Sequence, residues 1–271
     1  MRNLLVILLL ISAPAVFTSC DQLLKTISTL PEQGTTAKPD IVKGLKTALM
    51  VGTDTSVAVT SKLNGYYKDE AIKILLPPEA DIIYKNKDNA LFRATGLDRK
   101  IEEAILSLNR AAEDAAGQAA PIFKEAIRNM SITDGLSIVK GKNPAAQAQS
   151  AGFDSTAATA YLKSTTWSQL RPAFAPKVNA SLDKKLVGNY SPNQIWHSLT
   201  SAYNGIADKS FGMIKPVGHT DLGAYVTEKA LDGLFYKVGR EEIKIRRDPL
   251  AWTKTSVGHI LEQVFGSHSG W

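Results

Sequence analysis

Hydrophobic residues recur at helical spacing along most of the chain, and the most regular stretch runs from Tyr225 to Gly266. Its first half carries one apolar stripe, formed by Val226, Ala230, Leu231, Leu234, Phe235 and Val238. Asp248 and Pro249 end this helix and begin another, because the residue before a proline disfavours the helical conformation and proline suits the first helical position. The second stripe consists of Val257, Ile260, Leu261, Val264 and Phe265. The pattern predicts two amphipathic helices that meet at a corner.

The charged residues at the end of the first of these helices alternate in sign. Glu242 stands four residues before Arg246, an order that favours a helical ion pair of about 0.2–0.5 kcal/mol. The adjacent carboxylates Glu241 and Glu242 do not share a helix face, so we expect solvated charges there rather than an acid/base pair. The interleaving of these carboxylates with Lys244, Arg246 and Arg247 likewise predicts a solvated helix face.

Apolar stripes predict further helices in the rest of the body. One begins near Asp40, and a long one over residues 101–120 ends in a run of alanines that allows another helix axis to approach closely. Pro121 is expected to kink or restart that helix. Pro172 and Pro176 are expected to break up the first turns of a later helical region.

Capping signals and one extended run complete the pattern. Helix starts are predicted at Thr95-x-x-Asp98, Ser131-x-x-Asp134 and Ser191-Pro192-x-Gln194. The run IKILLPP, residues 72–78, has no comparable strand to pair with, so we expect an extended segment packed on helices. Together the elements predict an all-α fold, a single bundle-like domain of about eight helices.

The first residues have the composition of an export signal. Arg2 is followed by an apolar stretch too short for a normal membrane span, and small residues precede Cys20. Ser19-Cys20 resembles a bacterial lipobox, in which the cysteine becomes the acylated first residue of the mature protein. The alternative is an ordinary signal peptide followed by an incidental cysteine. As the only cysteine of the chain, Cys20 closes no intramolecular disulfide.

We therefore expect a lipoprotein signal peptide at 1–19 and a lipidated, flexible tether at 20–38, attached to a membrane through acylated Cys20. The helical domain covers 39–266, and 267–271 form a frayed tail. Such a protein is exported to the bacterial cell envelope and membrane-anchored, on the periplasmic or outer-membrane side.

Composition argues against nucleic acid as a partner. The net charge is +6 and the pI about 9.2, but the basic residues form no dense run. The tryptophans and phenylalanines are scattered at separate helical positions, which is typical of core packing and not of a base-stacking platform.

The C-terminal half of the chain contains four short motifs: ALDGLF at 230–235, the EE-x-x-IR run at 241–246, the Asp248-Pro249 pair and the closing VFG at 264–266. Together they resemble the DUF4197 family of bacterial exported proteins. Earlier segments agree, and the likeness covers roughly Pro39 to Gly266. It implies a helical exported domain and transfers no catalytic residue. Residues 142–155 depart from the family pattern and are expected to form a surface insertion.

Motifs that carry chemistry are missing from the sequence. The four histidines show no metal-ligand spacing, and there is no nucleophile elbow or phosphate-binding loop. We expect no metal and no cofactor. The interpretation leans towards a protein that is not an enzyme.

Two weaker candidates remain for a site. Asn109, Arg110 and Glu113 lie beside the alanine run, either as an ion pair that braces helix contacts or as a polar group inside a bundle cavity. Asp232 has the same ambiguity, and it could cap a helix or pair with Arg110. The longest irregular stretch, Ile206–Thr220, is the candidate contact loop, with Lys215 and His219 as its candidate residues.

Three functions stay open. The first is a non-enzymatic envelope lipoprotein of protein-interaction or structural type that contacts an envelope protein. The second is a helical binder of a lipid or another apolar ligand, which requires an internal cavity. The third is an enzyme with an unrecognised site, which requires titratable groups that converge in a cleft.

Overall fold

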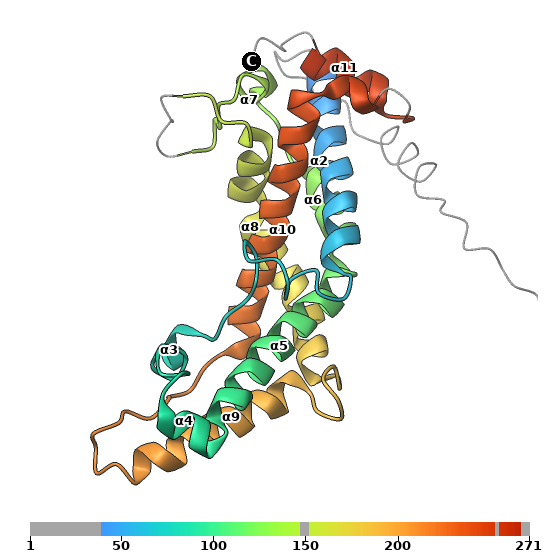
Figure 1. Cartoon of the computed structure of the whole chain (residues 1–271). Helices are drawn as coiled ribbons and strands as arrows, with labels where there is room; N and C mark the ends of the chain where they lie inside the picture. The colour runs from blue at the N-terminus through green and yellow to red at the C-terminus, as the bar shows by residue number, and fades with distance from the viewer. Residues whose placement is uncertain (1–38, 147–151, 253–254, 267–271) are drawn as a thin grey trace, which may run out of the picture.

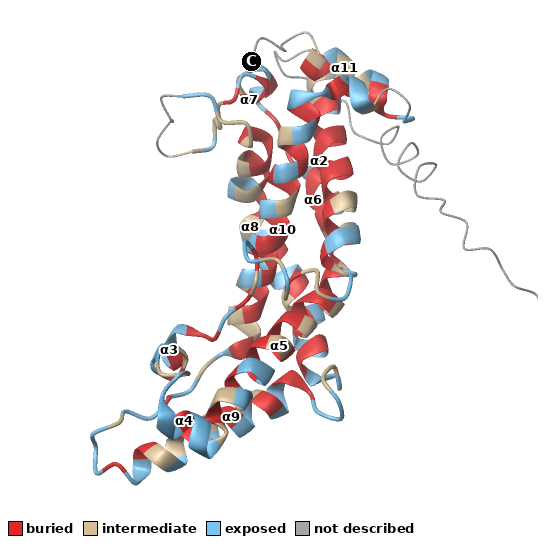
Figure 2. Cartoon of the chain, in the orientation of Figure 1, coloured by how far each residue is buried: buried red, intermediate tan, exposed pale blue. Residues whose placement is uncertain are grey.

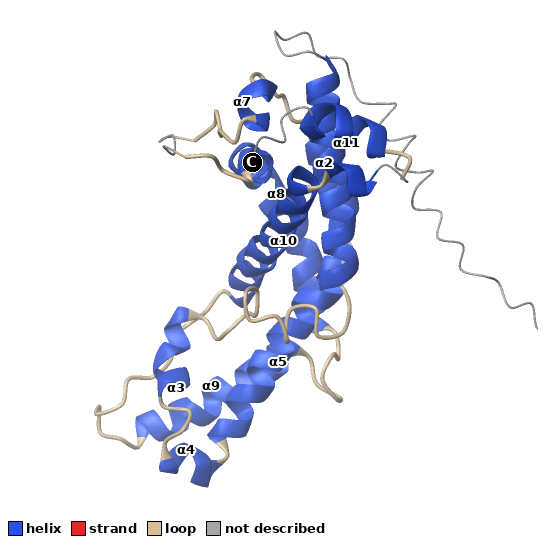
Figure 3. Cartoon of the chain, turned by 45° about the horizontal axis from the view of Figure 1, so that its top comes forward, coloured by secondary structure: helices blue, strands red, loops and turns tan. Residues whose placement is uncertain are grey.

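The computed structural model describes residues 39–146, 152–252 and 255–266. Over these ranges the chain forms ten α-helices, two short 3-10 helices and no β-strand, which confirms the predicted all-α class (Figure 3). Among the same residues, no helix combines the length and the apolar composition that a membrane crossing needs.

One long helix, α10 (Leu222–Arg247), forms the axis of an elongated body (Figure 1). It packs most extensively against α2 (Pro39–Thr60) and α8 (Ala157–Asp183). This part of the body is completed by α6 (Ala119–Asn129), α7 (Gly135–Val139), η2 (Pro249–Trp252) and α11 (Gly258–Phe265). The predicted corner at Asp248 is present, although the second helix is preceded by η2 and begins only at Gly258.

Helix α5 (Leu97–Ala116) leads from this bundle to a second group of helices at the opposite end (Figure 1). That group consists of η1 (Pro78–Ala80), α3 (Asp81–Lys85), α4 (Ala90–Thr95) and α9 (Pro192–Asp208). The buried residues follow the same division into a larger and a smaller apolar cluster (Figure 2). Residues of α5 belong to both clusters, so this helix connects the two ends through a continuous core.

The alanine run of α5 lies at the centre of the larger cluster, as predicted. Four of its side chains are fully buried, namely Ala111, Ala112, Ala115 and Ala116, and so is Ala119 at the start of α6. Such small side chains let neighbouring backbones approach closely. Pro121 lies in the first turn of α6, where a missing N–H breaks no helical hydrogen bond, so the predicted restart of the helix is confirmed.

The predicted break at Pro172 and Pro176 is wrong, because α8 runs through both prolines without interruption. Both prolines lie on the exposed side of the helix, where water can bind the carbonyl groups that lose their partners. The opposite side is a buried stripe with a spacing of four residues: Leu170, Phe174, Val178 and Leu182. Packing of this stripe against the core outweighs the local preference of proline.

Capping predictions succeed once and fail twice. Ser191 and Gln194 form the predicted capping box at the start of α9. Thr95 does not cap α5, since its hydroxyl donates to the Leu91 carbonyl 2.8 Å away and Gly96 takes the cap position. Helix α7 is capped by Asp134, which accepts from the Ser137 amide, and not by Ser131.

Candidate functional site

The connection between α2 and η1 consists mostly of turns up to Ile72, and the predicted extended run covers only residues 73–77. We call the whole connection the extended segment, and the predicted polar residues attach it to α5. The side-chain amide of Asn109 donates to the Ile74 carbonyl over 2.7 Å and accepts from the Ile74 amide over 2.9 Å. A further bond runs from Asn109 Nδ2 to the Ile105 carbonyl within α5. The fully buried Asn109 thereby satisfies both polar groups of the Ile74 backbone, as a neighbouring strand would.

Glu113 and Arg110 hold the start of the same segment. The Glu113 carboxylate accepts the backbone amides of Tyr66 and Tyr67, each over 3.1 Å, and is paired with Arg110. Arg110 also donates to the side chain of Asn64 over 2.9 Å. The structure therefore brings Asn109, Arg110 and Glu113 together as partners of the extended segment.

Asp232 lies elsewhere, and its predicted pairing with Arg110 is wrong. Its carboxylate is 2.7 Å from the Lys163 ammonium group, so the ion pair joins α10 to α8. The candidate loop residues Lys215 and His219 are exposed in the irregular stretch after α9. Helix α9 extends to Asp208, so this stretch begins later than predicted. Cys20 lies outside the described residues.

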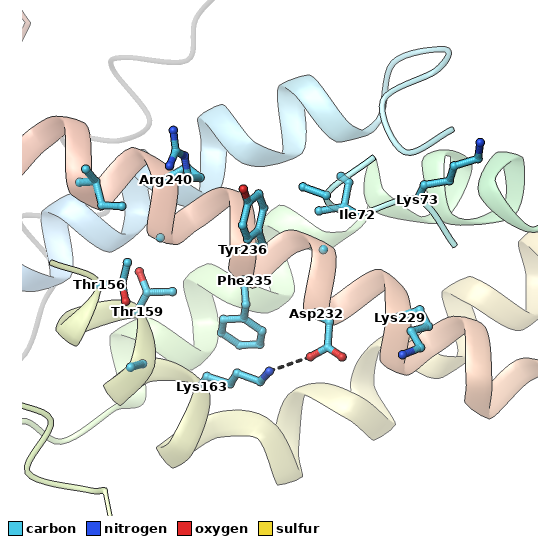
Figure 4. Close-up of a pocket in the computed structure, with 15 residues that line it drawn as sticks. Ile72, Lys73, Thr156, Thr159, Lys163, Lys229, Asp232, Phe235, Tyr236 and Arg240 are labelled. Atoms are coloured by element: carbon cyan, nitrogen blue, oxygen red, sulfur yellow. Dashed lines mark hydrogen bonds and ion pairs between the residues drawn. The ribbon is translucent and has the colours of Figure 1, made fainter. Parts of the chain in front are cut away.

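A groove runs along the outer side of α10, between α8 and the extended segment (Figure 4). It is open to solvent and has a volume of about 720 Å³. We call it the α10 groove, and its lining residues are Ala71, Ile72, Lys73, Thr156, Thr159, Ala160, Lys163, Lys229, Asp232, Gly233, Phe235, Tyr236, Gly239, Arg240 and Ile243. Of the predicted site residues, only Asp232 belongs to it.

Two glycines of α10 form part of the groove's floor and let other segments approach closely. A Cβ atom on Gly233 would lie 2.6 Å from a ring carbon of Tyr66, which is too close for any side chain. A Cβ on Gly239 would lie 3.3 Å from the Thr156 methyl group. The Tyr66 ring has little freedom to move, because it is fully buried and its hydroxyl donates to the Ala230 carbonyl over 2.7 Å.

Burial sets the protonation state of this tyrosine. It raises the pKa of the Tyr66 hydroxyl far above its ordinary value, and the negative charge of Glu113 raises it further. The hydroxyl therefore keeps its proton and acts as a hydrogen-bond donor below the floor of the groove.

Basic side chains dominate the electrostatics of the groove. Four of them line it, namely Lys73, Lys163, Lys229 and Arg240, against the single carboxylate of Asp232. The Lys163–Asp232 pair is almost half exposed on both sides, so its contribution to stability is about 1 kcal/mol at most. Arg240 has no ion pair or hydrogen bond through its side chain within the described parts of the chain. Lys73 lies 3.7 Å from the exposed carboxylate of Glu70, so Lys229 and Arg240 are the lining cations without an ion pair among the described residues, and they leave positive charge free to bind an anion.

A signal for the groove was present in the sequence. Lys229, Asp232, Tyr236, Arg240 and Ile243 recur every three or four residues on α10, which places them on one face beside the apolar stripe. The contributions of Lys163 and Lys73 come from distant parts of the chain and leave no such pattern. Within the described residues, no group of three or more histidine, cysteine or carboxylate side chains could hold a metal ion.

The end of α10 contains a buried ion pair where a solvated face was predicted. Glu242 and Arg246 are almost fully buried, with Arg246 Nε donating to Glu242 over 2.8 Å. The predicted pairing is therefore confirmed and the predicted exposure is wrong for both residues. Glu241 is also buried, and its carboxylate pairs with Lys244.

Both members of this pair bind the ends of other helices. Glu242 accepts from the amides of Ala158 and Thr159, at 2.9 and 2.7 Å, in the first turn of α8. Arg246 donates to the last carbonyl groups of α7, those of Ile138 and Val139, at 2.9 and 2.7 Å. A carboxylate thus meets a helix N-terminus and a guanidinium meets a C-terminus, the favourable sign at each end.

A family model described as "Protein of unknown function (DUF4197)" matches residues 35–266. The chain belongs to this family. No curated protein and no solved structure matches it significantly.

The segments that resemble DUF4197 can now be placed in the structure. ALDGLF lies in the middle of α10, where it supplies apolar core residues together with Asp232 and Gly233 of the groove. The EE-x-x-IR run contains the buried Glu242–Arg246 pair. In this DUF4197 protein, one helix therefore carries both the groove and the contacts that hold α7 and α8 in place.

Proposed function

We propose that this protein is a non-enzymatic lipoprotein of the bacterial cell envelope, held by acylated Cys20, that binds an acidic peptide segment of a partner protein in the α10 groove. The observation that supports the proposal is the charge of the groove. Four basic side chains line it, and its one carboxylate is already bound to Lys163. An acidic segment supplies the missing negative charge.

The dimensions of the groove suit an extended peptide. From Lys229 to Ile243 it follows α10 for about 21 Å, at a rise of 1.5 Å per residue. An extended chain rises about 3.3 Å per residue, so about six residues fit along it. The exposed ring of Tyr236 offers an apolar surface between the charges, a residue type enriched in protein interfaces.

The other two candidate functions have less support. An apolar ligand in this groove would displace water from Lys229 and Arg240 without offering either side chain a partner. For an enzyme, titratable groups would have to converge in a cleft that excludes water, whereas Asp232 is paired with Lys163 and both side chains are almost half exposed. Of the three candidate functions, the groove best supports the binding of an acidic segment.

Residues 36–271 are a suitable form of the protein for testing the groove. Both apolar clusters lie wholly between Ile41 and Phe265, so this form contains the complete described core. We expect it to bind a fluorescent hexaglutamate peptide, with an affinity that falls as salt is added. Replacing Lys229 and Arg240 together by glutamate should weaken binding more than tenfold, because each reversal turns an attraction into a repulsion of about 1 kcal/mol. Fluorescence anisotropy measures the affinity.

A matched control keeps the same change in net charge away from the groove. Lys177 and Lys185 are exposed and do not line it. Their double replacement by glutamate should leave the affinity within about a factor of two, since distant exposed charges are screened. Equal losses in the two double variants would mean that only net charge matters, and an absence of binding to the unaltered protein would refute the groove as a site for acidic peptides.

The anchor requires its own test in the full chain. We expect the protein to incorporate radiolabelled palmitate and to sediment with membranes, and Cys20→Ser to abolish both. Several acyl chains at about 0.8 kcal/mol per buried CH₂ explain a stable attachment. If Cys20→Ser is processed and released to the same extent as the unaltered chain, the ordinary signal peptide is the correct interpretation. That outcome would leave the groove unaffected.

A further inference from the structure

The loop between α9 and α10 exposes two large apolar side chains. Phe211 is 96% exposed and Met213 is 84% exposed, the highest values among the large hydrophobic residues that the structure describes. They lie on the two sides of Gly212, at the start of the irregular stretch that also contains Lys215. Neither side chain takes part in the apolar clusters, so their placement serves no purpose in the fold.

The loop is held in a defined conformation in spite of this exposure. The side-chain amide of Asn204 accepts from the Val217 amide over 2.8 Å and donates to the Val217 carbonyl over 3.0 Å. The Ser210 hydroxyl accepts from the Ile214 amide over 2.9 Å and donates to the Ala207 carbonyl over 2.6 Å. These four bonds fix both sides of the turn, so the exposed side chains are presented by a braced loop.

The backbone at Phe211 is strained as well as exposed. Phe211 has φ = 54° and Gly212 has φ = 83°, and the Met213 amide donates to the Ser210 carbonyl over 3.1 Å. Two successive positive φ angles closed by this bond make a type I′ turn, for which Asn-Gly is the preferred pair. Phenylalanine at the first position is unfavourable both for its backbone conformation and for its exposure to water. The coincidence of both costs at one residue indicates that its side chain has a partner outside the chain.

We propose that this turn, together with its flanking lysines, is a tip that inserts into an anionic lipid surface. Lys209 and Lys215 each stand two residues from an apolar side chain of the tip, and neither forms an ion pair within the described ranges. Amphipathic lysines beside buried apolar groups are typical of contacts at the headgroup level. The nearest carboxylate in the sequence is that of Asp208, which is the last residue of α9 and directly precedes Lys209.

The shape of the tip favours a membrane over a protein partner. A specific protein interface needs about 800 Å² on each side, which a convex turn with two apolar side chains does not supply. Insertion into the headgroup region needs no complementary surface. The loop also lies at the end of the body opposite to the start of α2, so this contact is separate from the proposed anchor (Figure 1, Figure 3).

Sedimentation with vesicles of phosphatidylethanolamine and phosphatidylglycerol in equal amounts tests the proposal on residues 36–271. The unaltered protein should bind, and Phe211→Asn should lower the partition coefficient at least about tenfold, the effect of withdrawing one large apolar side chain from an apolar environment. The variant stays folded, with an equal or higher melting temperature, because Asn-Gly is the preferred pair for this turn. Leu63→Asn is the matched control, since Leu63 is 73% exposed in the turn after α2, and its binding should equal that of the unaltered protein.

The lysines give a second readout. Each of Lys209→Ala and Lys215→Ala should lower the partition coefficient about fivefold, the factor that corresponds to roughly 1 kcal/mol per basic residue near an anionic surface. Binding to vesicles of phosphatidylcholine alone should be weaker and insensitive to these changes. The proposal is overturned if the unaltered protein stays in the supernatant with every vesicle, or if Phe211→Asn binds as well as Leu63→Asn. It is also overturned if the unaltered protein is a dimer that Phe211→Asn dissociates, because the tip would then contact a second copy.

Discussion

Alanine in place of Arg246 is expected to lower the free energy of unfolding by about 3–5 kcal/mol, the usual cost of removing one partner of a buried ion pair. The residue is 3% exposed, and its side chain binds the Glu242 carboxylate together with the last two carbonyl groups of α7. Without it, Glu242 would be a buried charge with no counter-charge, and the end of α7 would lose its donors. The guanidinium also lies 5.2 Å from the ring centroid of Phe265, so contact with α11 would be lost too. The total stability of a domain is about 5–15 kcal/mol, so the effect is large.

Urea unfolding of residues 36–271, followed by circular dichroism, measures this loss. The neighbouring Arg247 is exposed, so Arg247→Ala should change the stability by about 0.5 kcal/mol or less. Arg246→Lys should fall between the two, because lysine keeps the charge but cannot bind the carboxylate and both carbonyl groups with one planar fork. A stability of Arg246→Ala within about 1 kcal/mol of the unaltered protein would contradict the assigned role.

Helix positions were predictable because the signals that specify them are local. The apolar stripes of α10 and the alanine run of α5 lie within single helices, and so does the Ser191 capping box. Periodicity identifies such segments without any knowledge of their partners. The prolines of α8 show the limit of this approach, since the buried stripe that keeps the helix intact packs against other elements.

Exposure at the end of α10 was not predictable from spacing. Glu242 and Arg246 are four residues apart in an interleaved charge pattern, which most often marks a solvated face. Their burial is explained by backbone groups of Thr159 and Val139, which lie 83 and 107 residues away in the chain. A carboxylate or guanidinium can be buried when it binds the unpaired backbone groups at a helix end. Tertiary packing decides which helix end lies within its reach.

The groove and the tip were each predictable only in part, for different reasons. The groove residues of α10 share one helix face, but Lys163 and Lys73 reach the groove from separate segments and leave no local pattern. Phe211 and Met213 lie within the predicted contact loop, Ile206–Thr220, but their exposure was not predictable because large apolar residues are usually assigned to the core. The basic lining of the groove and the exposed apolar side chains of the tip do not stabilise the fold. Functional contacts are expected at such places.

Alanine in place of Asn109 is expected to lower the free energy of unfolding by about 2–4 kcal/mol. The loss has a simple origin: the amide and the carbonyl of Ile74 are buried, and each would be left without its partner at a cost of about 1–3 kcal/mol. Asn129→Ala removes the same side chain from an exposed position and should have little effect. Equal stabilities of these two variants would contradict the role of Asn109.

Hydrogen exchange locates the damage in Asn109→Ala. Exchange of the Ile74 amide should accelerate strongly, whereas the amides of Tyr66 and Tyr67 should stay protected because Glu113 still binds them. The loosened part of the segment includes Lys73, which lines the α10 groove. The affinity for hexaglutamate should therefore fall in Asn109→Ala and stay unchanged in Asn129→Ala. If Ile74 remains protected while hexaglutamate binding falls, Asn109 acts on the groove by a route other than the extended segment.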